Sequence, residues 1–183
     1  MKSKKKILLD IKKLCVSIVE NSKNKKLIKS VSFNIKKNEI VGLIGESGSG
    51  KSLTSLCILG LLEKKKFNIS GEIYFNQRNI INLQENEIMK IRGSEISMIF
   101  QEPMTALNPT MKIGEQLFEV FQSHENIDNK EISSRIEKLI KKVKLDNVEN
   151  LFDKYPHQLS GGQKQRAMIV MALSCNPRLL IAD

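Results

Sequence analysis

Gly45-Glu46-Ser47-Gly48-Ser49-Gly50-Lys51-Ser52 is the stretch that decides the fold, because it matches the phosphate-binding pattern G-x-x-x-x-G-K-[ST]. Its three glycines let backbone N–H groups approach a triphosphate and allow positive φ angles. A helix beginning near Lys51 would direct its positive end at the phosphates. Lys51 would then contact the β- and γ-phosphates, and the Ser52 hydroxyl would bind Mg²⁺. A chance match has odds of about one in a hundred in such a chain, so the pattern indicates nucleotide binding.

Short apolar runs surround this loop. Residues 39–44 (EIVGLI) precede it and LTSLCILGLL (53–62) follows it, which predicts a strand, a loop and a buried helix. Two further runs, 95–100 (EISMIF) and 179–182 (LLIA), also predict strands. Continuous apolar strands are typical of a parallel sheet covered on both faces. The expected fold class is therefore α/β.

Other segments predict the outer layers. Residues 7–19, 27–36 and 69–75 have strand composition, with a polar loop, ENSKNKK, between the first two. They suggest an antiparallel β-layer. Residues 111–151 predict helices with one apolar stripe, which consists of Ile132, Ile136, Leu139, Ile140 and Val143.

Composition sets broad limits. The chain has 183 residues, a formal charge of +10, 40% apolar and 27% charged residues, which fits one globular domain. No apolar run approaches the roughly 18–20 residues that span a bilayer, and Asp10 interrupts any signal-peptide core. Cys15, Cys57 and Cys175 are odd in number and far apart, and they form no CxxC pattern. We therefore expect reduced thiols, and neither a disulfide framework nor a zinc site. The lysine clusters could bind an anionic partner such as nucleic acid or a membrane surface, or they could simply be solvated surface. Solvated surface is favoured, because a groove that stacks bases would need aromatic residues among the lysines, and there are none.

Three later features add candidate site residues. Gln101 comes after an apolar strand, where it could reach a bound metal or water. A Gln at the end of a strand is, however, often only an exposed surface residue. Ser160-Gly161-Gly162-Gln163 is either an ordinary helix-capping box or a second anion pocket. If it is a pocket, each copy would complete the other's site in a dimer. Asp183 ends a buried strand and could hold Mg²⁺ and hydrogen-bond Ser52.

In this order, the four elements resemble the ATP-binding cassette (ABC) family over essentially the whole chain. They look like Walker A (Gly45–Ser52), the Q-loop (Gln101), the signature (Leu159–Gln163) and the start of Walker B (Leu179–Asp183). FQEPMTALNP and YPHQLSGGQKQR further resemble the oligopeptide, dipeptide and nickel importer ATPases.

The resemblance implies a P-loop (RecA-like) parallel core with an antiparallel β-layer and an inserted helical subdomain, incomplete at the C-terminus. The expected regions are the nucleotide-binding core at 1–102, the helical subdomain at 103–165 and a return to the core at 166–183. It also implies a peripheral ATPase on the cytoplasmic face of the membrane, binding ATP and Mg²⁺. Its partners would be a second ATPase subunit, identical or not, two permeases and, indirectly, an extracytoplasmic substrate-binding protein, with no nucleic acid.

The sequence departs from the family pattern in two places. The Glu that polarises water and the switch His would follow Asp183, and neither His124 nor His157 can replace that histidine. We therefore expect a fragment of a longer protein that hydrolyses ATP slowly or not at all alone. Ile18 replaces the aromatic residue that commonly stacks on adenine, which predicts weaker adenine affinity. The alternatives are a non-catalytic nucleotide-binding remnant and a soluble cassette ATPase acting on nucleic acid.

Overall fold

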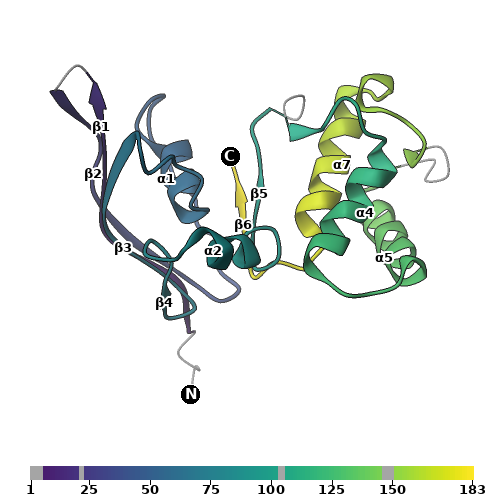
Figure 1. The fold of residues 1–183 in the computed structure, drawn as a ribbon, viewed down its shortest axis with the longest axis horizontal. Helices are drawn as coiled ribbons and strands as arrows, with labels where there is room; N and C mark the ends of the chain where they lie inside the picture. The colour runs from purple at the N-terminus through teal and green to yellow at the C-terminus, as the bar shows by residue number, and fades with distance from the viewer. Residues whose placement is uncertain (1–5, 21–22, 103–105, 146–150) are drawn as a thin grey trace. The chain divides into compact units, whose positions relative to one another are not determined.

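The computed structural model describes residues 6–20, 23–102, 106–145 and 151–183, and Figure 1 shows its elements. The chain divides into two compact units, Met1–Ile88 and Met89–Asp183. The first unit contains β1 (Ile7–Glu20), β2 (Lys23–Lys36), α1 (Lys51–Ile58), β3 (Phe67–Phe75) and β4 (Arg78–Asn79). Helix α2 (Glu85–Ile91) crosses the division. The second unit contains β5 (Ile96–Ile99), α4 (Ile113–His124), α5 (Asn129–Lys142), a 3₁₀ turn (Pro156–Gln158), α7 (Gly161–Leu173) and β6 (Leu179–Ala182).

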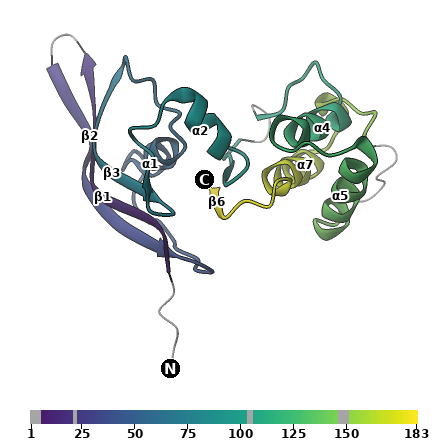
Figure 2. The ribbon, with the colours of Figure 1, turned by 60° about the horizontal axis from the view of Figure 1, so that its bottom comes forward.

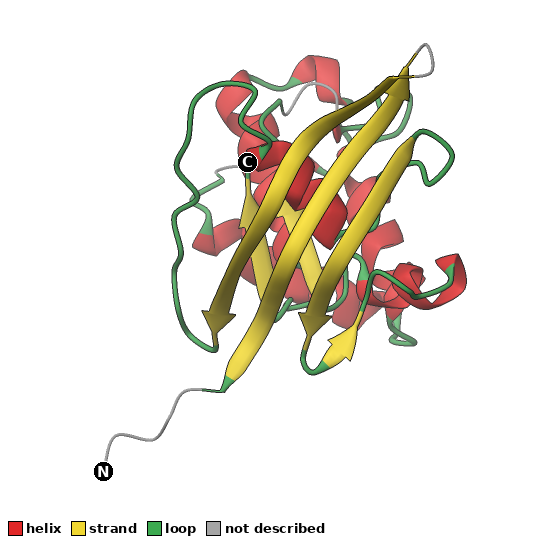
Figure 3. Ribbon diagram, turned by 90° about the vertical axis from the view of Figure 1, so that its left-hand side faces the viewer, coloured by secondary structure: helices red, strands yellow, loops and turns green. Residues whose placement is uncertain are grey.

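The first unit is built on an antiparallel sheet of strand order β2-β1-β3-β4 (Figure 3). Its apolar side chains alternate onto one face, and α1 lies against that face (Figures 1 and 2). The side chains that are at most 2% exposed there include Leu9, Ile11, Leu14, Val16, Ile28, Ile73 and Phe75. The predicted antiparallel layer is confirmed. The connection between β1 and β2 is shorter than predicted, because pairing continues as far as Glu20 and Lys23.

A bulge in β1 keeps its apolar residues on the buried face. Ile11 and Leu14 are both buried although three positions separate them, and the pairing register shifts between them. Lys13 takes the extra position with φ 49°. Opposite it, Gly71 has φ 99°, and a Cβ there would lie 2.5 Å from the Lys13 carbonyl oxygen. Only glycine fits this close approach of two backbones.

The predicted strand over residues 39–44 is wrong. The structure assigns no strand there, and Ile40 and Ile44 are 101% and 96% exposed. A strand is stabilised by backbone hydrogen bonds to a neighbouring strand, and no described strand pairs with this segment. Apolar composition alone therefore did not produce a strand.

The second unit confirms the other two predicted core strands. Strands β5 and β6 pair in parallel, from Ile96 with Leu179 to Ile99 with Ala182. The predicted helical region contains α4 and α5, and Asp128 caps α5 by accepting a 2.7 Å hydrogen bond from the Glu131 N–H. The predicted apolar stripe is confirmed, because it lies in the helical core. Core side chains that are 0% exposed include Ile113, Leu117, Phe121, Ile132, Ile136, Ile140, Ala167 and Val170.

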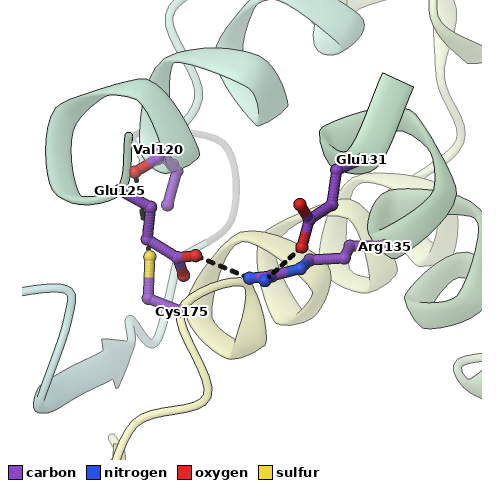
Figure 4. Close-up of polar contacts among 5 residues, drawn as sticks. All are labelled: Val120, Glu125, Glu131, Arg135 and Cys175. Carbon is purple, nitrogen blue, oxygen red and sulfur yellow. Dashed lines mark hydrogen bonds and ion pairs between the residues drawn. The ribbon is translucent and has the colours of Figure 1, made fainter. Parts of the chain in front are cut away.

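A polar cluster joins the ends of these helices (Figure 4). The Arg135 guanidinium donates to Glu131 on its own helix and to Glu125, which follows α4, with both N–O distances at 2.6 Å. These bonds, that to Glu131 first, raise the pKa of Arg135. The Cys175 thiol, just after α7, lies 3.8 Å from the Val120 carbonyl oxygen. The cluster thus links α4, α5 and the segment that leads into β6.

Candidate nucleotide-binding site

The loop at residues 45–52 has the backbone shape that a phosphate cradle requires. Helix α1 begins at Lys51, as predicted, and Gly48 and Gly50 have φ 76° and 95°. Gly45 is not among the residues of the loop with a positive φ. A Cβ there would lie 2.7 Å from Ser49 Oγ, so a larger residue would displace that hydroxyl. The loop is closed by a 3.2 Å hydrogen bond from the Ser49 N–H to the Glu46 carbonyl oxygen.

The ammonium group of Lys51 lies inside this loop. Its Nζ is 2.7 Å from the carbonyl oxygens of Gly45 and Glu46 and 3.4 Å from Ser49 Oγ. Gly50, the N-cap of α1, has no side chain to cover the first N–H groups of the helix. A fixed cation beside uncapped helix N–H groups fits the phosphate chain of a nucleotide.

Strand β2 supports the loop from behind, a role that the sequence reasoning missed. A Cβ on Gly50 would lie 3.0 Å from Ile28 Cγ1 and 3.5 Å from the Leu27 carbonyl oxygen. Ile28 is 2% exposed. The local sequence gave no sign of this contact, because the β1–β2 ladder shifts register between Val31 and Ile28.

Gln101 and Asp183 belong to the second unit and lie at the same edge of its parallel strands. The Asp183 N–H donates a 3.0 Å hydrogen bond to the Ile99 carbonyl oxygen, and Gln101 follows Ile99 by two residues. Both residues are exposed. The structure therefore brings these two candidates together, as expected for the carboxyl ends of parallel strands. The predicted link from Asp183 to Ser52, an exposed residue in the first turn of α1, stays a prediction.

The signature residues form the capping box that the sequence allowed. Ser160 Oγ accepts a 3.3 Å hydrogen bond from the Gln163 N–H, and Gln163 Oε1 accepts one of 3.0 Å from the Ser160 N–H. Gly161 and Gly162 are exposed, and a Cβ on either would meet nothing within 4 Å. The packing of this chain therefore does not explain why two glycines stand here.

A buried amide shapes the turn that follows the Q-loop segment. Gln116 is 7% exposed, and its Oε1 accepts a 2.9 Å bond from the Asn108 N–H. Its Nε2 donates to the carbonyl oxygens of Asn108 (2.9 Å) and Met111 (3.0 Å). A polar residue within an apolar helical stripe was the available signal, and the sequence reasoning did not use it. These three bonds satisfy the buried side-chain amide of Gln116.

The three cysteines are free thiols, of which Cys57 is buried and Cys15 and Cys175 are partly buried. Burial raises the pKa of Cys57 to about 12 and that of Cys175 to about 11. A thiol with a raised pKa is a poor nucleophile at neutral pH. Neither residue is therefore a candidate for covalent chemistry.

The raised pKa of Cys57 predicts a loss of stability in alkali. Full stability is present below pH 9, where the thiol is protonated in both states. Between pH 9 and the folded pKa of about 12, only the unfolded chain ionises it, so unfolding gains about 1 kcal/mol by pH 10. Urea unfolding at pH 8 and pH 10 should show a smaller decline for Cys57→Val than for the parent chain. Equal declines would contradict the prediction.

No helix in the described ranges is both long and apolar enough to cross a membrane. Within the same ranges, no group of three or more His, Cys, Asp or Glu side chains is arranged to hold a metal ion.

Comparison with curated proteins finds ATP-binding proteins of peptide transport. The chain is 50% identical over 157 residues to the oligopeptide transport ATP-binding protein AppD of Bacillus subtilis, covering 85% of this chain and 48% of AppD. It is 43% identical over 176 residues to the oligopeptide transport ATP-binding protein OppD of Escherichia coli, covering 96% of this chain and 52% of OppD. The chain thus spans about half the length of these curated relatives.

Solved structures and a family model agree with the fold. The dimeric structure of the ATP-binding cassette MJ0796 in a post-hydrolysis state, bound to ADP and Pi, matches with a TM-score of 0.82 and 30% identity. The match covers 96% of this chain and 73% of that one. The ABC transporter family model matches residues 28–183. The predicted fold class and the predicted resemblance to peptide-importer ATPases are confirmed, and this chain belongs to the ABC transporter family.

Proposed function

We propose that the chain binds Mg²⁺-ATP at residues 45–52 and belongs to the ATP-hydrolysing subunit of an importer of oligopeptides or dipeptides. The position of the Lys51 ammonium carries the proposal. It lies 2.7 Å from two carbonyl oxygens of the loop, next to the uncapped start of α1. A triphosphate bound there would gain a cation and N–H donors from the first turn of the helix.

Ser52, Gln101 and Asp183 are the residues that we assign to Mg²⁺. Their hydroxyl, amide and carboxylate oxygens suit this ion. When bound, Mg²⁺ neutralises charge on the phosphate oxygens during phosphoryl transfer. This chain holds Gln101 and Asp183 at one sheet edge through the β5–β6 ladder.

The signature residues would complete the site of a second ATPase subunit. Gly161 and Gly162 leave open space that the packing of their own chain does not require. Glycines at an exposed helix start let another molecule approach the backbone N–H groups closely. The dimeric state of the related cassette MJ0796 supports this arrangement. The partner would be a second copy of this chain or a homologous ATPase subunit.

Two permease subunits would be the membrane partners, with a substrate-binding protein acting through them. A cavity of about 330 Å³ in the second unit supports this assignment. Its lining includes the apolar side chains of Met98, Phe100, Met168 and Met171. The proposed helical subdomain (103–165) supplies much of the remaining wall. The subunit would thus act at the cytoplasmic face of the membrane.

The test is reconstitution of the chain, within its complete gene product, with its permeases in lipid vesicles. We expect ATP hydrolysis that a peptide and its binding protein stimulate severalfold. ATP binding without turnover would identify a non-catalytic remnant. Stimulation by RNA or DNA in place of peptide would identify an ATPase of the nucleic-acid class. Either outcome would overturn the importer assignment.

A further inference from the structure

The sheet of the first unit has a second face, which α1 does not cover and which Figure 3 turns toward the viewer. Tyr74 lies on this face, because its neighbours Ile73 and Phe75 are buried on the other one. A cavity of about 400 Å³ adjoins Tyr74, and the rest of its lining consists of Lys6, Ile7, Leu8, Asp10, Lys12 and Gln77. This volume is within the range of small-molecule sites, roughly 300–1,000 Å³.

The cavity carries charges of both signs beside an aromatic ring. Lys12 Nζ lies 4.9 Å from the centre of the Tyr74 ring and 3.5 Å from Asp10 Oδ2. The Asp10 side chain is 26% exposed, so ligands can still reach it. The Lys6 ammonium has no ion-pair partner among the residues that the structure describes. The cavity thus offers a carboxylate and an ammonium with apolar surface around them.

Backbone hydrogen bonds hold these two charges apart. Asp10 pairs with Tyr74 on β3, and the Lys6 carbonyl oxygen accepts a 3.0 Å hydrogen bond from the Lys37 N–H. Four residues of extended chain separate the backbones of Lys6 and Asp10 by at most about 13 Å. The long lysine side chain can shorten this separation for its ammonium. The remaining span suits a dipeptide, about 7 Å long when extended, better than a single amino acid.

We propose that this cavity binds a short peptide with free ends. The ammonium end would pair with Asp10, which can keep Lys12 as well because a carboxylate accepts through both oxygens. The carboxylate end would pair with Lys6. The Tyr74 ring and Leu8 would contact an apolar side chain of the ligand.

The mixed charge of the cavity selects this class of ligand. Charge-assisted hydrogen bonds at both ends favour a zwitterion, whereas the Asp10 carboxylate would repel a polyanion such as a second nucleotide. The cavity shares no residue with the phosphate loop or with the cavity of the second unit. The inference therefore goes beyond the proposed function and does not depend on it.

Calorimetric titration of the full chain with the dipeptide Leu-Leu tests this assignment. We expect saturable binding, which should be about tenfold weaker for N-acetyl-Leu-Leu and for Leu-Leu amide, because each lacks one charged end. Leucine, which is too short to reach both charges, should also bind about tenfold more weakly.

Asp10→Asn identifies the group that receives the ammonium end. It should weaken Leu-Leu binding about tenfold and leave N-acetyl-Leu-Leu binding unchanged, because that ligand has no ammonium to lose. Glu63→Gln is the matched control, since it also removes the carboxylate of an exposed ion pair, with Lys66, in the same unit but outside the cavity. Its Leu-Leu affinity should equal that of the parent chain.

Several results would overturn the peptide site. One is a folded parent chain that does not bind Leu-Leu, and another is equal affinity for Leu-Leu and its two blocked forms. An equal loss of both ligands in Asp10→Asn would indicate a structural defect instead of a lost contact. Titration of the same sample with Mg²⁺-ATP separates the proposals, because a chain that binds ATP but not Leu-Leu retains the nucleotide site and loses this one.

Discussion

Replacement of Lys51 by alanine should reduce Mg²⁺-ATP affinity by about a hundredfold or more, the scale of charge-assisted hydrogen bonds lost at a phosphate. The ammonium is the one cation that the structure places within the loop among the described residues, at 2.7 Å from the Gly45 and Glu46 oxygens. The loop should keep its fold, since Gly45 and Glu46 are exposed residues whose carbonyl groups can accept hydrogen bonds from water once the ammonium is removed. Calorimetric titration measures the change.

Lys65→Ala serves as the matched control, because it removes an equal charge from an exposed position of the same unit. Its ATP affinity should equal that of the parent chain. Thermal unfolding of both variants should also match the parent. Tight ATP binding by a folded Lys51→Ala chain would contradict the assignment of the phosphate loop.

Substitution of Ser160 by arginine should abolish ATP-dependent dimerisation while the phosphate loop of the same chain still binds ATP. A long cationic side chain would fill the open space in front of Gly161 and Gly162. It would also remove the helix cap that Ser160 provides to the Gln163 N–H, at about 1 kcal/mol of stability. Light scattering with and without Mg²⁺-ATP measures the dimer.

Ser160→Ala separates these two effects, because it removes the cap without adding bulk. We expect it to weaken dimerisation but not abolish it. Ser160→Asn, which can still cap the helix, should retain the stability of the parent chain. If the arginine variant dimerises normally, the signature residues do not face a second subunit.

Much of the fold was predictable from local patterns. Strands β1, β2, β3, β5 and β6, the apolar stripe of α5 and the start of α1 at Lys51 follow from periodicity, glycine placement and capping residues, whereas the short strand β4 was not predicted. The segment 39–44 shows the limit of this reasoning. Its apolar run predicts a strand, but strand formation depends on a partner elsewhere in the chain, which composition does not encode.

The sequence by itself was enough to predict nucleotide binding. The phosphate loop is a local structure, and its glycines, lysine and serine all lie within eight positions. Only the tertiary structure decided what surrounds that loop. Ile28 behind Gly50, Phe67 in register with Ile18, and the bond from Asp183 to Ile99 each depend on pairing between distant strands. Register is set by bulges and by burial of whole faces, so a single stretch of sequence cannot specify it.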